Sequence, residues 1–205
     1  MLVGLDFDNT IVSYDELFHR VALEQDAIPS DLPATKTAVR DYLRRQGQED
    51  LWTEMQGYVY GRRMGEARAF PGVEAFFRTC WDRHIPVVII SHKTQHPYRG
   101  PKHDLHAAAR AWLAGQSFLP GDWVKQRVFF EVTKEEKLRR IARQRCTHFV
   151  DDLPEFLALP GFPAGTRPIL FSPTQPTEPP NLAVVRCWDE LTTLILHEAA
   201  AEKTP

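Results

Sequence analysis

The stretch that decides the fold of this chain reads VGLDFDNT over residues 3–10. Its first residues are apolar, which is typical of a buried strand. Asp6 and Asp8 follow at the carboxyl end of that strand, where open α/β sheets place their ligands. Two carboxylates this close repel each other unless a cation lies between them, so the pair indicates a metal site. Taken alone, an acidic turn with capping residues is an alternative that stays open.

Two later apolar runs also end in polar residues. The run 86–90 ends at Ser91, and the run 147–150 ends at Asp151 and Asp152. Alternation of such strands with helical stretches predicts a parallel sheet with right-handed crossovers. The carboxyl ends of parallel strands share one edge of the sheet, so we expect these residues to gather near the first acid pair.

A helical stretch between those two strands begins with Lys134 and Lys137. An acid pair, a serine, a lysine and a second acid pair therefore follow one another along nearly the whole chain. This ordered set resembles the haloacid dehalogenase-like (HAD) hydrolase superfamily, which is dominated by phosphatases. The resemblance implies an α/β fold: a doubly wound parallel sheet, with a small α-helical cap inserted after the first strand.

The resemblance also implies a role for each acid of the first pair. Asp6 would attack phosphorus and form an aspartyl-phosphate. Asp8 would protonate the leaving alcohol and then deprotonate the attacking water. The dehalogenases of the superfamily lack an acid at the position of Asp8, so its presence favours phosphoryl transfer.

Phosphate contacts follow from the same resemblance. Ser91 holds the position of a residue that hydrogen-bonds the phosphoryl oxygens, although a serine at a strand end is commonly only a cap. Lys137 is favoured over Lys134 as the lysine that neutralises the phosphoryl group. Thr10 and His92 are further phosphate-binding candidates.

The expected metal is Mg²⁺, which prefers oxygen ligands and bridges to phosphate. The resemblance implies that Asp152 is the direct ligand in the second acid pair, with Asp151 as close support. Asp6 and the backbone carbonyl of Asp8 complete the expected metal site.

Composition describes an ordinary globular protein. Charged residues make up 25% of the 205 residues, and the formal net charge of −2 gives no reason to expect nucleic acid or a membrane as a partner. The three cysteines are widely spaced and form no CxxC pair, which suits a reducing cytoplasm. We expect a cytoplasmic protein whose partner is a small phosphorylated metabolite.

The chain divides into an expected core domain, residues 1–13 and 71–205, and an expected helical cap, residues 14–70. Three helical stretches fill the cap range, and an apolar stripe at helical spacing marks each of them. A proline-rich stretch over residues 173–180 predicts a surface loop.

The stretch that follows Ser91, residues 92–103, carries three lysine or arginine residues and three histidines before any acid. This positively charged stretch is expected to begin at the rim of the active site, where it would favour substrates with additional negative charge. The simpler alternative is an ordinary solvent-exposed loop. Tyr58, Tyr60, Arg62 and Arg63 form a similar candidate group in the cap, with an ordinary polar helix face as the alternative.

Together these features predict Mg²⁺-dependent hydrolysis of a small phosphomonoester. Two alternatives use the same residues. A phosphomutase would return the phosphoryl group to its substrate, and a phosphate-sensing or scaffold protein would have lost turnover.

Overall fold

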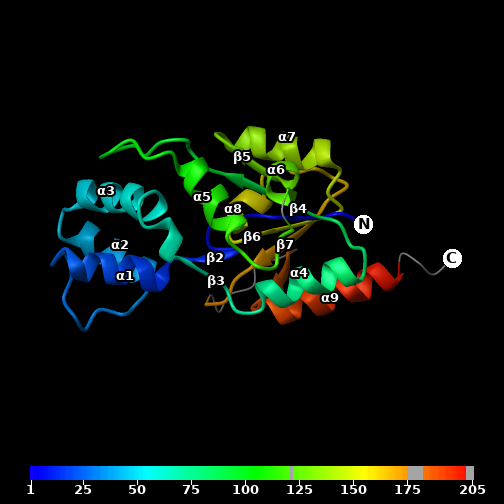
Figure 1. Ribbon diagram of the computed structural model, residues 1–205, viewed down its shortest axis with the longest axis horizontal. Helices are drawn as coiled ribbons and strands as arrows, with labels where there is room; N and C mark the ends of the chain where they lie inside the picture. Colours follow the sequence, from blue (N-terminus) through cyan, green and yellow to red (C-terminus); the bar gives the residue numbers. More distant parts are fainter. Residues whose placement is uncertain (121, 175–181, 202–205) are drawn as a thin grey trace. The chain divides into compact units, whose positions relative to one another are not determined.

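The computed structural model describes residues 1–120, 122–174 and 182–201. The chain divides into two compact units, whose elements are labelled in Figure 1. The first unit contains residues 1–11, 69–92 and 117–205, and the second contains residues 12–68 and 93–116.

The first unit is built on a six-stranded parallel sheet in the order β5-β4-β1-β6-β7-β8. Its strands are β1 (Val3–Leu5), β4 (Val87–His92), β5 (Val128–Glu131), β6 (His148–Asp151), β7 (Arg167–Phe171) and β8 (Ala183–Val185). The chain extends the sheet outward from β1 in both directions, and the predicted doubly wound parallel sheet is confirmed.

Helices cover both faces of this sheet. They are α4 (Val73–Asp82), α6 (Trp123–Arg127), α7 (Lys134–Gln144), α8 (Pro154–Leu157) and α9 (Trp188–Ala201). Figure 1 shows α4 and α9 together on one face, with α7 on the other. The helical stretch predicted to begin near Lys134 is α7, whereas α6 and α8 span only one turn or little more.

Alternation along the strands supplies an apolar side chain to each helix layer. On one face Ile141 of α7 and Phe156 of α8 pack in one buried cluster with Val88 and Phe149. This face needs glycine at position 4 of β1, because a Cβ there would lie 2.5 Å from the ring of Phe149.

The opposite face is closed by α4 and α9 through aromatic contacts. The Trp188 ring lies 5.1 Å from the Phe76 ring and 5.9 Å from the Phe171 ring, measured between centroids. Trp188 also donates from Nε1 to the backbone oxygen of Thr10, at 3.2 Å. This bond ties the turn after β1 to the helix layer.

The second unit is helical. It contains α1 (Asp15–Glu24), α2 (Lys36–Arg45), α3 (Glu49–Tyr60), the 3₁₀ turn η1 (Met64–Glu66) and α5 (Leu105–Ala114). The short strands β2 (Val12–Ser13) and β3 (Arg68–Ala69) pair where the chain passes between the units. Thr35 and Asp104 cap α2 and α5 by accepting hydrogen bonds from backbone N–H groups of the first turn.

The segment between β4 and α5 packs against α3 within the second unit. A Cβ at position 57 would lie 2.6 Å from Pro97, and a Cβ at position 61 would lie 2.5 Å from His103. Gly57 and Gly61 therefore allow this segment to approach α3 closely. Residues 93–116 accordingly group with the helical unit, although the expected cap ended at residue 70.

Two predictions concern features outside the packed elements. Most of the predicted proline-rich loop, residues 175–180, lies outside the described residues. Among the helices the structure describes, none combines the length and apolar character needed to cross a membrane.

Candidate active site

Three neighbouring strands deliver the predicted polar residues to one edge of the sheet. In the register of the sheet Leu5 lies opposite Ile89 of β4 and Val150 of β6. Asp6 directly follows Leu5, Asp151 directly follows Val150, and Ser91 lies two residues after Ile89. The backbone N–H of Asp6 donates to the Val150 carbonyl at 2.8 Å, which holds Asp6 in line with β6.

Lys137 joins two of these acids. Its ammonium lies 2.5 Å from Oδ1 of Asp6 and 2.6 Å from Oδ2 of Asp151. The lysine is 2% exposed, and its Nζ also lies 4.3 Å from the centroid of the Phe156 ring. Lys134, the competing candidate, is exposed at the start of the same helix. The structure thus brings Lys137 to the acids and leaves Lys134 at the surface.

The start of α7 fixes where Lys137 enters the site. The Thr133 side chain accepts a hydrogen bond from Glu136 N at 3.1 Å and so caps the helix. The backbone N–H of Lys137 donates to the Thr133 carbonyl at 3.1 Å. Lys137 therefore lies one turn inside a capped helix, with its side chain held among buried groups.

Burial and charge act in opposite directions on Asp6. Desolvation raises the pKa of Asp6 to about 7, against an ordinary value of 3.8, and the nearby Asp151 and Asp8 carboxylates add to this rise. Lys137 opposes it through its charge and its hydrogen bond. For Lys137 itself burial acts to lower the pKa, but the Asp151 and Asp6 carboxylates outweigh burial and raise it. The lysine therefore stays protonated, whereas burial and the neighbouring carboxylates make Asp6 harder to ionise than an exposed aspartate.

A divalent cation fits the donor set at this edge. Carboxylate oxygens of Asp6, Asp151 and Asp152 lie within 4.8 Å of one another. Hard cations such as Mg²⁺ take ligands of this kind. The side chain of Asp8 is not part of this group, and its expected contribution is a backbone carbonyl.

The two acids of the second pair have different surroundings. Asp151 is completely buried, and both of its carboxylate oxygens accept protein hydrogen bonds, from Lys137 and from the Leu153 N–H. Asp152 is partly exposed. Asp151 is therefore held by protein donors, as a supporting residue beside a metal ligand would be.

The remaining phosphate-binding candidates lie on the same edge. Ser91 is 1% exposed near the end of β4. His92 Nε2 lies 3.1 Å from the Val132 carbonyl, and because a carbonyl only accepts, this nitrogen carries the hydrogen. Desolvation lowers the pKa of His92, which favours the neutral ring. Since Val132 directly precedes the residue that caps α7, this bond connects the Ser91 strand to the helix that carries Lys137.

Thr10 is fully buried, and its hydroxyl oxygen has no hydrogen-bond partner among the described residues. It follows Asn9, whose φ of 58° places the turn after Asp8 in the left-handed region. An unsatisfied buried hydroxyl is unfavourable by roughly 1–3 kcal/mol, so its presence at this turn is unusual.

Two arginines that the sequence offered as substrate-binding candidates, Arg99 after β4 and Arg63 after α3, form ion pairs with acids. Arg99 contacts Asp50 at 3.0 Å and Glu54 at 3.0 Å, both on α3, and Arg63 contacts Glu24 and Glu66. These two arginines hold the second unit together. Lys93 is 4% exposed, and sequence reasoning gave it no role beyond the general charge of the rim.

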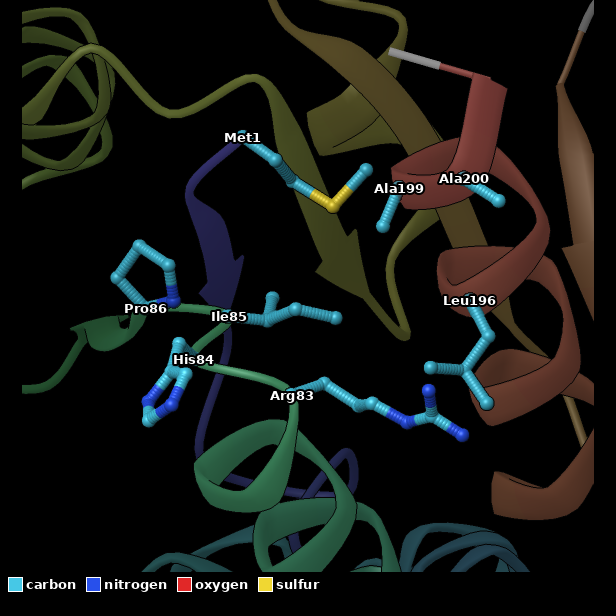
Figure 2. Close-up of a pocket in the computed structure, with 8 residues that line it drawn as sticks. All are labelled: Met1, Arg83, His84, Ile85, Pro86, Leu196, Ala199 and Ala200. Carbon is cyan, nitrogen blue, oxygen red and sulfur yellow. The ribbon is translucent and has the colours of Figure 1, made fainter. Parts of the chain in front are cut away.

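A groove in the first unit lies at the other edge of the sheet (Figure 2). Met1 and Pro86 line it, and both precede the strands whose far ends carry the acids. Arg83 extends along it toward Leu196 of α9, and none of the described residues that line it is an acid. The groove is therefore separate from the acid cluster, and its described lining lacks the groups that the predicted chemistry needs.

Comparison with known proteins identifies the fold. No protein-family model matches the sequence, and no curated protein matches it. Three similar solved structures, each matching 95% or 96% of this chain and 96–98% of the other, are a predicted phosphatase from Clostridium acetobutylicum (15% identity, TM-score 0.61), a HAD-superfamily hydrolase from Ehrlichia chaffeensis (12%, 0.57) and a putative HAD hydrolase from Bacillus subtilis bound to magnesium (12%, 0.51). Identities this low establish the fold alone. The chain has the α/β fold of the HAD-like hydrolases.

Proposed function

We propose that this chain is a Mg²⁺-dependent phosphatase that hydrolyses a small phosphomonoester through an aspartyl-phosphate on Asp6. The observation that carries the proposal is the buried Lys137 ammonium, which lies 2.5 Å from Asp6 and 2.6 Å from Asp151 at the carboxyl edge of the sheet. A purely structural cluster would not need a third acid, Asp152, beside the two that the lysine already pairs.

The first half of the reaction forms a bond between Asp6 and phosphorus. A carboxylate oxygen of Asp6 attacks phosphorus while the bond from phosphorus to the alcohol oxygen breaks. Asp8 gives its proton to that oxygen, and the alcohol leaves neutral. Lys137 restrains the Asp6 carboxylate through Oδ1 and supplies positive charge beside the phosphoryl oxygens.

The second half restores the enzyme. Asp8, now ionised, takes a proton from a water molecule whose oxygen attacks phosphorus. The bond from phosphorus to the Asp6 oxygen breaks, and inorganic phosphate leaves. Ser91, Thr10 and the backbone N–H of His92 are the proposed donors to the phosphoryl oxygens. A ligand there would give the buried Thr10 hydroxyl the partner it lacks among the described residues.

Mg²⁺ would be held by Asp6, Asp152 and the Asp8 carbonyl, with Asp151 in support, and would neutralise charge on the phosphoryl group. A cation there would also lower the pKa of Asp6, because it opposes the desolvation and carboxylate repulsion that raise it. Metal binding and the ionisation of the nucleophile are thus coupled, because both involve the Asp6 carboxyl group. We assign the helical residues of the second unit the role of a cap.

Phosphate release from a panel of metabolite phosphomonoesters tests the proposal. We expect release in Mg²⁺ and at least about a 100-fold slower rate in EDTA, with activity restored by added Mg²⁺. Release that is unchanged in EDTA would contradict the metal requirement. Transfer between positions of a sugar without phosphate release would identify a phosphomutase. Mg²⁺ binding without turnover of any compound would favour a phosphate sensor.

A further inference from the structure

The Lys137 ammonium has more neighbours than the two carboxylates that the mechanism uses. An ammonium group carries three N–H donors, and Nζ of this lysine donates to Asp6 and Asp151. Two aromatic rings also lie near it, because Nζ is 4.3 Å from the centroid of the Phe156 ring and 5.4 Å from that of the Phe149 ring. The face of an aromatic ring attracts a cation, and the attraction is strongest where water is excluded. The lysine is 2% exposed, so these contacts are of the strong kind.

The turn after β6 supplies both the Asp151 carboxylate and the Phe156 ring. Leu153 joins them, because its backbone N–H donates to Asp151 Oδ1 at 3.0 Å and its carbonyl accepts from the Phe156 N–H at 3.0 Å. Phe156 is the third residue of α8, which begins at Pro154, and proline favours the first position of a helix. One short segment therefore holds the ring and the carboxylate at a fixed spacing.

Packing keeps the ring of Phe156 beside the lysine. Phe156 is 1% exposed and Phe149 is fully buried, and their ring centroids lie 6.2 Å apart. The Phe162 ring lies 6.2 Å from the first and 6.5 Å from the second, again between centroids. Protein interiors are closely packed, so the Phe156 ring cannot swing away from Lys137 without leaving a cavity among these rings.

We propose that Phe156 is a positioning residue, whose ring face holds the Lys137 ammonium where it contacts both Asp6 and Asp151. Each carboxylate attracts the ammonium, but a cation bound to the acids would compete for their oxygens and repel the lysine. An uncharged ring keeps its attraction when such a charge arrives. Phe156 acts on the reaction only through Lys137. This inference rests on the proposed phosphatase function.

A fluorinated phenylalanine at position 156 tests this role. 3,4,5-Trifluorophenylalanine, incorporated by genetic code expansion, has nearly the shape of phenylalanine, but its fluorine atoms withdraw negative charge from the ring face. Position 162 is the matched control. Phe162 packs against the same two rings, and among the described residues no cation lies over it.

The first readout is the midpoint of chemical denaturation in EDTA, which does not depend on turnover. Fluorination at position 156 weakens the attraction for the buried ammonium, so we expect the midpoint to fall. The same replacement at position 162 should leave the midpoint close to that of the wild type. Equal shifts at the two positions would mean that the Phe156 ring contributes packing alone, and they would overturn the proposal.

The second readout is turnover of a phosphomonoester that the unmodified enzyme hydrolyses. We expect fluorination at position 156 to lower kcat at least about 3-fold with KM nearly unchanged, because Lys137 neutralises charge in the transition state. At position 162 both constants should keep their wild-type values. A lower midpoint without any loss of kcat at position 156 would make the contact purely structural and overturn the positioning role.

The two readouts also separate this inference from the proposed function. Metal-dependent phosphate release that is insensitive to fluorination at position 156 supports the phosphatase and overturns the positioning role. If the unmodified enzyme releases no phosphate from any compound, the proposed function fails. The denaturation midpoints then still decide whether the Phe156 ring holds the ammonium.

Discussion

Replacing Asp6 with asparagine is expected to lower turnover of any phosphomonoester the enzyme hydrolyses by at least about 10⁴-fold. The amide cannot attack phosphorus, and among the described residues no other carboxylate occupies this position between Lys137 and the end of β1. Steady-state phosphate release measures the loss. Retention of more than trace activity in a well-folded variant would remove Asp6 as the nucleophile.

The same substitution should stabilise the metal-free protein at pH 8. The Asp6 pKa is about 7 in the folded state and 3.8 ordinarily, so between these values the folded state retains a proton that the unfolded state has lost. The wild type therefore loses stability as the pH rises from about 4 to about 7, by up to roughly 4 kcal/mol in unfolding free energy. Asparagine does not ionise and avoids this loss.

Chemical denaturation in EDTA at two pH values checks the sign of this effect. At pH 5 the folded wild type holds Asp6 protonated, so the variant should gain less there than at pH 8. A variant that is less stable than the wild type at pH 8 would mean that the Lys137 contact outweighs the burial of the Asp6 charge.

Replacing Lys137 with methionine has the second large expected effect. The substitution keeps an unbranched side chain, one heavy atom shorter, but removes the only cation that contacts both Asp6 and Asp151 among the described residues. Leaving buried carboxylates unpaired should lower the unfolding free energy at pH 8 by about 3–5 kcal/mol. Turnover should fall at least about 100-fold, because the positive charge beside the phosphoryl group is lost.

Lys134→Met is the matched control for this prediction. Lys134 begins the same helix one turn earlier and is exposed, so its replacement should change both stability and turnover little. Denaturation curves and phosphate release on the two variants separate the lysines. Equal, mild losses in both would mean that neither lysine acts in the reaction.

The strand ends of the fold could be predicted from the sequence because each combines an apolar run with a polar residue at its end. Asp6, Ser91 and Asp151 gather at one edge as expected, since parallel strands align their carboxyl ends. The choice of Lys137 over Lys134 rests on the resemblance to the HAD superfamily. The contacts of Lys137 with Asp6 and Asp151 follow from the capped start of α7.

Other features depend on contacts that no local pattern encodes. Residues 93–116 join the helical unit because the segment after β4 packs onto Gly57 and Gly61, and two glycines four residues apart on a predicted helix were the available signal. Arg99 pairs with α3 through side chains about 45 positions away in sequence. The short helix α6 has too few residues to show a helical period.

The measurement that tests the central claim most directly is trapping of the phosphorylated enzyme. Wild-type protein is mixed with a radiolabelled phosphomonoester and Mg²⁺, quenched rapidly in acid, digested and mapped by mass spectrometry. The account predicts an acyl-phosphate on the peptide that contains Asp6 and no label in the Asp6→Asn variant. Phosphate release that proceeds at the wild-type rate without any label on Asp6 would contradict it.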